Sequence, residues 1–325
     1  MPLAGFDEEF KDLPDYILKI TRRIWEDRHV DAIRTYYTDD APVRSPSGIV
    51  VGAEAVVSAT MSTLAEFPDR QLYGEDVIWA GSDAEGYFSS HRILSTATYA
   101  IDGGYGSAAG QKLTYRIIAD CACRDNKVYD EWLVRDQGAI VRQLGLDPKE
   151  FAAERIANAG GPERFPPPLT NDNEHASGYS AVLPQQNGPG TRYADMLQRI
   201  MGSDFAVIRS DYDRAVQQEQ AGGITEHGWA AVDHFWMGLK AAFPDAEFSI
   251  DHVVGREDAA RPPRAAVRWS LSGRHSGSGR FGSPSGANVY LLGISQAEFG
   301  PYGINREWVL FDEVAIWQQI LMQTG

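Results

Sequence analysis

The side chains of this chain that could move protons are histidines and carboxylates on predicted strands or directly after them. Burial shifts the pKa of both groups toward neutrality, where a general acid or base works best. A side chain of this kind in an apolar pocket could transfer a proton to or from a small molecule. The catalytic candidates are His91, Asp120, Asp136, His275, Glu298 and Asp312.

Each candidate also has a structural interpretation. His91 and Arg92 are neighbours on a predicted strand, so they lie on opposite faces and only one can line a pocket. Asp120 is a general-base candidate if it faces the pocket and a solvent-facing strand residue if it does not. Asp136 and Asp312 precede predicted helices, so each is either a catalytic carboxylate or a helix cap. The histidines are either catalysts or surface and core residues with satisfied hydrogen bonds.

Aromatic and charged residues near these positions are candidates for substrate binding. Alternation puts Trp269, Leu271 and His275 on one face of a predicted strand, the pattern of an apolar pocket wall that ends in an imidazole. The binding candidates are Arg92, Tyr99, Trp132, His252, Arg268, Trp269, Glu307 and Trp308.

The chain repeats itself at a fixed distance of 176 residues. Phe67-Pro68-Asp69 recurs as Phe243-Pro244-Asp245, and Glu131-Trp132 recurs as Glu307-Trp308. The alignment needs no gap over residues 52–143 of the first copy. A copied domain explains this pattern better than chance does. We expect the shared residues to be mainly scaffold and the copy-specific ones to carry any specific activity.

Some of the repeated residues are charged. Arg92 and Glu131 recur as Arg268 and Glu307. Their structural interpretation is an ion pair within each copy, and the alternative is a role in an active site.

The elements that must position these residues are helices followed by strands in each copy. Apolar residues at helical spacing predict the helices, and runs rich in Val, Ile, Tyr and Thr between glycine-containing turns predict the strands. This order predicts an α+β domain and not a parallel doubly wound sheet. For the first copy we predict helices over 16–37, bent or broken, and 53–66, a short strand within 41–51, strands near 72–80, 86–101, 111–123 and 127–135, and a short helix from Asp136. For the second copy we predict helices over 193–220, 229–243 and after Asp312, and strands near 247–255, 264–275, 287–298 and 304–311.

The chain is long enough for two domains. With 325 residues, of which 43% are apolar, it can bury two ordinary cores. The segment between the copies is rich in Pro, Gly, Asn and Ser, which predicts a linker. We therefore divide the chain into a first domain (1–155), a linker (156–190) and a second domain (191–325).

Composition argues against several partners and cofactors. The net charge of −15 does not suit nucleic acid or an anionic membrane, since both need a concentrated basic surface. The N-terminal residues lack the pattern of a secretory signal, and no apolar stretch reaches membrane-spanning length, so we expect a cytoplasmic protein. Cys121 and Cys123 are core residues or, alternatively, a metal pair, and they cannot form a disulfide framework. No dinucleotide or paired metal-ligand motif occurs, so we expect no metal and no cofactor.

Three sequence features of the copies carry a resemblance to a known family. They are Phe-Pro-Asp after the third helical segment, the strand from Arg268-Trp269 to His275 with its following glycines, and the Glu-Trp pair that ends in Asp. Together they span nearly the whole of both copies, which resemble the SnoaL-like polyketide cyclase branch of the nuclear-transport-factor-2-like superfamily. The resemblance implies two tandem cone-shaped domains, each with N-terminal helices packed on a curved antiparallel or mixed sheet around one pocket.

Members of that branch close a ring by an intramolecular aldol reaction without metal or cofactor, with a pocket carboxylate as acid and base. They often carry an Asp directly after the Trp of the last strand, where this chain has Leu133 and Val309. The matching carboxylates are then Asp136 and Asp312, three positions further on. Asp120 lies on the penultimate strand, where the family also often has a carboxylate.

These features support three hypotheses of function. The first is a cofactor-independent enzyme that performs proton transfer, such as cyclisation, isomerisation, dehydration or hydrolysis, on a small organic molecule. The second is a small-molecule binding or interaction module that does not catalyse. The third is a division of labour in which one copy is active and the other is its partner in an intramolecular pseudo-dimer with an internal two-fold axis. A homodimer of the whole chain is a further expectation.

Overall fold

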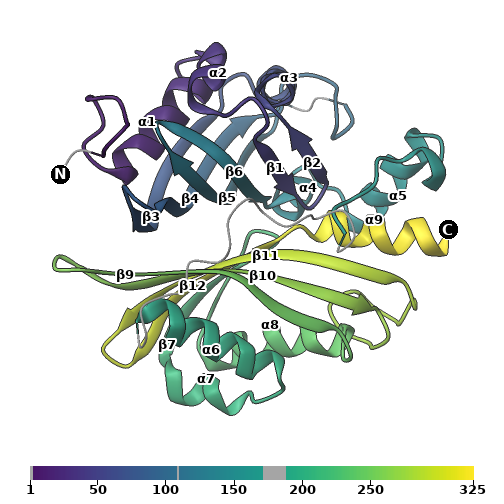
Figure 1. The fold of residues 1–325 in the computed structure, drawn as a ribbon. Coiled ribbons are helices and arrows are strands. Elements are labelled where there is room, and N and C mark those ends of the chain that lie inside the picture. Colours follow the sequence, from purple (N-terminus) through teal and green to yellow (C-terminus); the bar gives the residue numbers. More distant parts are fainter. Residues whose placement is uncertain (1–2, 108–109, 171–187) are drawn as a thin grey trace.

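The structure, a computed structural model, describes residues 3–107, 110–170 and 188–325. Within these residues the chain forms two units of the same design, each with helices followed by a six-stranded sheet (Figure 1). The predicted α+β class and the tandem duplication are confirmed. Residues 171–187 of the predicted linker lie outside the described residues. None of the helices in the described ranges is long and apolar enough to cross a membrane.

Helix α1 (Leu13–Trp25) opens the first unit and shows how sequence pattern becomes structure. Asp12 caps the helix by accepting a hydrogen bond from the backbone N–H of Asp15 at 2.9 Å. Apolar residues every three or four positions form one buried face. The other helices of this unit are η1 (Val30–Ala32), α2 (Ile33–Tyr36), α3 (Ala53–Glu66), α4 (Gln137–Gln143), α5 (Pro148–Asn158) and η2 (Pro162–Arg164). Its strands are β1 (Pro42–Ser45), β2 (Gly48–Val51), β3 (Gln71–Ser82), β4 (Gly86–Thr98), β5 (Lys112–Arg124) and β6 (Lys127–Arg135).

The second unit repeats this plan. Its helices are α6 (Pro189–Met201), α7 (Ala206–Asp211), α8 (Trp229–Ala242) and α9 (Glu313–Thr324). Its strands are β7 (Tyr212–Gln220), β8 (Ile224–His227), β9 (Glu247–Asp258), β10 (Arg261–Arg274), β11 (Asn288–Gly300) and β12 (Gly303–Phe311). The strand orders are β2-β1-β6-β5-β4-β3 and β8-β7-β12-β11-β10-β9. Both sheets are mixed, because β1 runs parallel to β6 and β7 parallel to β12, whereas the other neighbours are antiparallel.

The prediction of one helix over 193–220 is wrong. Helix α6 ends at Met201, α7 is a short helix, and residues 212–220 form strand β7. This segment is rich in Gln, Ala, Glu and Arg, which favour helices in isolation. Pairing of residues 217–220 with residues 306–309 of β12 outweighs that local preference. Helix α5, which begins in the predicted first domain, ends at Asn158 within the predicted linker and packs against α9, is not among the predicted elements.

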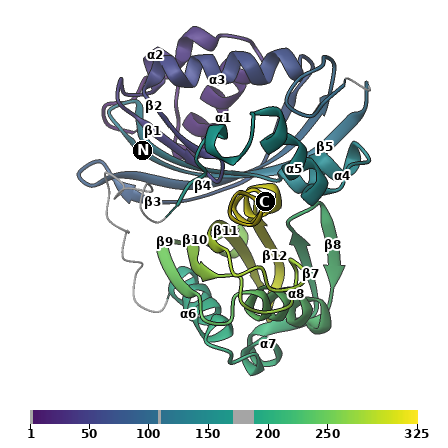
Figure 2. The same cartoon turned by 90° about the vertical axis from the view of Figure 1, so that its right-hand side faces the viewer.

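The two sheets face each other, and helices α1, α3, α6, α7 and α8 lie on the outside (Figures 1 and 2). The guanidinium carbon of Arg92 lies 3.5 Å from the ring centre of Trp308, and that of Arg268 lies 4.1 Å from the ring centre of Trp132. The two arginines hold equivalent positions in the copies, as do the two tryptophans, so the contacts are reciprocal. Reciprocal contacts are the mark of a two-fold interface. The packing of the two copies against each other within the chain is therefore confirmed.

Candidate functional site

A cavity of about 300 Å³ lies inside the first unit, between its helices and the inner face of its sheet. This volume is at the lower end of the range for small-molecule sites. Its walls are mostly apolar and come from α1, α3 and the strands. The principal apolar residues are Ile17, Ile20, Ile24, Val43, Val56, Ile93, Ile117 and Leu133, and the principal polar ones are Tyr37, Arg70, His91, Glu131, Arg135 and Asp312.

Glu131 of β6 is the carboxylate of this cavity that best suits proton transfer. Its side chain is 8% exposed, and burial raises its pKa to about 7, although the hydrogen bond from Tyr37 opposes the shift. The Tyr37 hydroxyl donates that bond to Oε2 at 2.6 Å. Near neutral pH the carboxyl group is therefore present in both forms, so it can accept a proton and return it.

His91 of β4 also lines the cavity, and Arg92 points to the opposite face of the sheet. The expectation that only one of the two lines a pocket is confirmed. Burial lowers the pKa of His91 to about 4, with the negative charge of Asp120 opposing the shift. The imidazole is thus neutral at pH 7. Its Nδ1 lies 3.5 Å from Oγ of Ser89, and as a neutral ring it can form a hydrogen bond to a ligand oxygen.

The interior of the second unit is filled by large side chains. Trp236 takes the position of Thr60, and Trp269 takes that of Ile93. Both tryptophans are fully buried, with ring centres 5.8 Å apart. Gly293 makes room for the indole of Trp269, since a Cβ there would lie 2.2 Å from an indole carbon. The positions that surround the cavity in the first copy thus form a packed hydrophobic core in the second.

Glu307, the second-copy equivalent of Glu131, lies within that core. Its carboxyl group accepts hydrogen bonds from the hydroxyls of Tyr193 and Tyr212 and from Nε2 of Gln218, each at 2.7 Å. Burial raises the pKa of Glu307, and these hydrogen bonds oppose the shift. The glutamate at this repeated position therefore borders a cavity in the first copy, as Glu131, and accepts hydrogen bonds within a packed core in the second, as Glu307.

Several predicted site residues lie between the two sheets and not in the interior of either unit. Asp120 is buried there, with its Oδ2 3.1 Å from Nδ1 of His252 and 3.9 Å from Arg268. The prediction of ion pairs Arg92–Glu131 and Arg268–Glu307 is wrong, because alternation puts each arginine and its glutamate on opposite faces of the sheet. Arg92 instead pairs with Glu75 at 3.0 Å. The solvent-facing alternative for Asp120 is also wrong, since it is 1% exposed.

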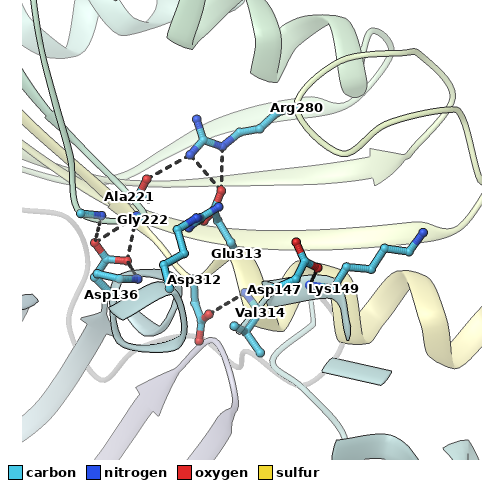
Figure 3. Close-up of polar contacts among 12 residues, drawn as sticks. Asp136, Asp147, Lys149, Ala221, Gly222, Arg280, Asp312, Glu313 and Val314 are labelled. Carbon is cyan, nitrogen blue, oxygen red and sulfur yellow. Dashed lines mark hydrogen bonds and ion pairs between the residues drawn. The ribbon is translucent and has the colours of Figure 1, made fainter. Parts of the chain in front are cut away.

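Asp136 and Asp312 cap helices α4 and α9, as the structural interpretation predicts (Figure 3). Asp136 accepts a hydrogen bond from the N–H of Ala139 at 2.9 Å and from those of Gly222 and Gly223 in the second unit at 2.8 and 3.0 Å. Asp312 accepts from Val314 at 2.9 Å and from Ala315. Burial raises the pKa of Asp136 to about 6 and that of Asp312 to about 7. Asp312 also borders the cavity of the first unit.

Of the remaining residues, His275 and Tyr99 have hydrogen-bond partners outside the cavity. His275 of the second unit has its Nδ1 3.0 Å from Oγ of Ser285 and its ring 5.5 Å from that of Phe243. The Tyr99 hydroxyl donates to the carbonyl oxygen of Gly106 at 2.6 Å. Glu298 is half-buried near the end of β11. Both free cysteines, Cys121 and Cys123, are buried, and Cys121 borders the cavity.

Sequence reasoning does not select three polar residues of the cavity, namely Tyr37, Arg70 and Arg135, and it gives an active-site role for Glu131 only as the alternative to an ion pair. Glu131 recurs in both copies, which points to scaffold, and only the structure shows that it borders a cavity in one of them. The sequence does contain a signal that selects the two arginines as cavity candidates. Arg70 and Arg135 align with Ala246 and Phe311, so the comparison of copies that favours His91 also selects them.

Comparison with known proteins finds one matching family and several distantly similar structures. Residues 191–320 match the family of SnoaL-like polyketide cyclases. Among solved structures, IdmH from Streptomyces antibioticus is 17% identical and aligns over 42% of this chain and 100% of its own, with a TM-score of 0.37. A SnoaL-like polyketide cyclase from Agrobacterium tumefaciens is 21% identical over 39% of this chain and 94% of its own, with a TM-score of 0.32. No curated protein matches the sequence significantly. Residues 191–320 are therefore similar to SnoaL-like polyketide cyclases, and the first unit repeats the architecture of the second.

Proposed function

We propose that the first unit is a cofactor-independent proton-transfer enzyme that acts on a small organic molecule, and that the second unit is its built-in pseudo-dimer partner. The observation that carries this proposal is Glu131, a buried carboxyl group with a pKa of about 7 at the wall of an otherwise largely apolar cavity. A packed core in the second unit supports the division of labour.

The chemistry proposed for Glu131 is removal of a proton from a carbon next to a carbonyl group. The electron pair of the broken C–H bond moves to the carbonyl oxygen, which becomes an enolate. His91, as a neutral imidazole, donates a hydrogen bond to that oxygen in the tautomer that carries the ring proton toward it. In a cyclisation, the enolate carbon bonds to a second carbonyl carbon, and protonated Glu131 returns its proton to the new alkoxide. In an isomerisation, the proton returns to a different carbon.

Hydrogen exchange on simple ketones tests this proposal without knowledge of the natural substrate. The full chain is incubated with 1-tetralone or 1-indanone in deuterated buffer, and deuterium at the carbon next to the carbonyl is measured by mass spectrometry. We expect exchange above the buffer rate. Glu131→Gln should lower the enzymatic rate by about 10²- to 10⁴-fold, because the general base is lost. Glu307→Gln is the matched control, with the same substitution at the duplicate position, and it should leave exchange unchanged in a folded protein.

The alternative function is a non-catalytic binding module. It is motivated by the apolar walls of the cavity and by the absence of the family's post-Trp Asp, since Leu133 and Val309 occupy those positions. Binding of the ketones without any exchange above the buffer rate would favour this alternative. Equal exchange by the wild type and Glu131→Gln would remove Glu131 from the mechanism.

A further inference from the structure

Two arginine side chains, Arg70 and Arg135, border the cavity of the first unit in addition to Glu131 and His91. Arg70 is 3% exposed, stacks 5.0 Å from the ring centre of Trp25, and donates from Nε to Oγ of Ser95 at 3.3 Å. Its Nη1 is buried without a hydrogen-bond partner among the described residues. The Tyr115 hydroxyl interacts with this guanidinium electrostatically but forms no hydrogen bond with it. Arg70 therefore presents an unused donor inside the protein.

Arg135 adds a second positive charge at the same cavity. It lies on β6, two residues from Leu133 and four from Glu131, so alternation puts all three on the inner face of the sheet. Its Nε is also buried and has no partner within the described part of the chain. Burial and the charge of Arg135 lower the pKa of Arg70 to about 10, which leaves Arg70 protonated at neutral pH.

The charge of Arg70 costs free energy unless something compensates it, because a buried charge needs a partner, and the half-buried Arg135 adds a second positive charge at the same cavity. Over residues 3–107, 110–170 and 188–325, no carboxylate forms an ion pair with Arg70 or Arg135. The carboxyl groups that border the cavity are engaged elsewhere, Glu131 with Tyr37 and Asp312 with its own helix. The filled second cone carries Ala246 and Phe311 at the equivalent positions, so the fold itself does not require the two charges.

We propose that the cavity binds an organic carboxylate, with the acid group held by Arg70 and Arg135 and the apolar remainder against the isoleucines of α1. The planar guanidinium group matches a carboxylate in geometry and charge. A monoanion fits better than a dianion, because Glu131 and Asp312 border the same space and would repel the second charge. This inference rests on the proposed function, since it takes the first cone as the ligand site.

Matched pairs of acids and primary amides test the inference. The probes are 2-naphthoate, 4-phenylbutanoate and octanoate, each against its amide, and affinity for the full chain is measured by calorimetry. For at least one pair we expect the acid to bind about 10- to 100-fold more tightly, as for hydrogen bonds to a charged group. Arg70→Met should bring the two affinities within about twofold, and Arg70→Lys should retain part of the preference. Arg22→Met is the control, because Arg22 is 71% exposed on the outside of α1 and should change nothing.

Each other outcome has a definite meaning. Should Arg70→Met fail to fold, Arg135→Met serves as the second variant with the same expected loss of preference. Acid preference that survives both Arg→Met substitutions overturns the inference, as does equal binding of acid and amide or no binding of any acid. Thr60→Trp separates the two proposals, because it fills the cavity. If acid and amide bind equally and Thr60→Trp abolishes both, the carboxylate inference fails and the ligand site stands. If binding survives Thr60→Trp, the proposed ligand site fails as well.

Discussion

Replacing Glu131 with glutamine should change the pH dependence of folding stability in a defined direction. The folded-state pKa of Glu131 is about 7, above its usual value of 4.5. A carboxyl group whose pKa rises on folding gives stability that is fully present below the unfolded pKa and lost as pH rises toward the folded pKa. The wild type should therefore lose stability at this site between about pH 4.5 and pH 7.

The size of the effect follows from the shift. Each pKa unit corresponds to about 1.4 kcal/mol, so the full loss is about 3 kcal/mol, of which about 2 to 3 kcal/mol falls between pH 5 and pH 8. The amide introduced by Glu131→Gln cannot ionise and can still accept the hydrogen bond from Tyr37. The variant should thus match the wild type near pH 5 and exceed its free energy of unfolding by about 2 to 3 kcal/mol at pH 8.

Urea unfolding of both proteins at a series of pH values measures this difference. Asp136 and Asp312 also have raised pKa values, but they are present in both proteins and cancel in the subtraction. A difference in unfolding free energy that stays constant from pH 5 to pH 8 would contradict the assignment of a raised pKa to Glu131. It would remove the main physical reason to make that residue the general base.

Four further substitutions test this interpretation. Tyr37→Phe should raise the pKa of Glu131 above about 7, because the lost hydrogen bond favours the ionised form, and carbon NMR of the carboxyl group measures it. Thr60→Trp should change the unfolding free energy by less than about 1.5 kcal/mol, since the indole enters existing space. The opposite exchange, Trp236→Thr, should cost about 3–5 kcal/mol in urea unfolding, and equal costs would contradict the contrast between the cones. Asp136→Ala should cost about 2–3 kcal/mol, because it removes a helix cap and the link to the second unit, and a loss below about 0.5 kcal/mol would contradict that role.

Much of the fold could be predicted from the sequence because the duplication gives two independent examples of one pattern. Helix α3 (Ala53–Glu66) has the predicted bounds, and the long strands lie within a few residues of prediction. Strand β7 could not be predicted, because its residues favour a helix and only pairing with β12 makes them a strand.

The candidate site was harder to predict because both faces of each sheet are buried. One face borders a cone and the other borders the partner sheet, so polar residues occur on both. Alternation separates His91 from Arg92 but cannot say which of them faces the cone. Asp120 and His252 therefore resemble pocket residues in sequence, although they lie between the sheets. Whether the interior of a unit is hollow depends on side-chain volume at positions such as Thr60 and Trp236. The sequence does not show that these positions line the two interiors, so the difference in their volumes could be interpreted only with the structure.

Ligands should bind inside the first unit and not inside the second, and isoleucine methyl NMR distinguishes the two sites. Ile24 of α1 borders the cavity, and Ile200, its equivalent in α6, lies in the packed core of the second unit. In a titration of the full chain with 1-tetralone, we expect the methyl signals of Ile24 and Ile93 to shift and that of Ile200 to stay unchanged. A shift at Ile200 without one at Ile24 and Ile93 would contradict it.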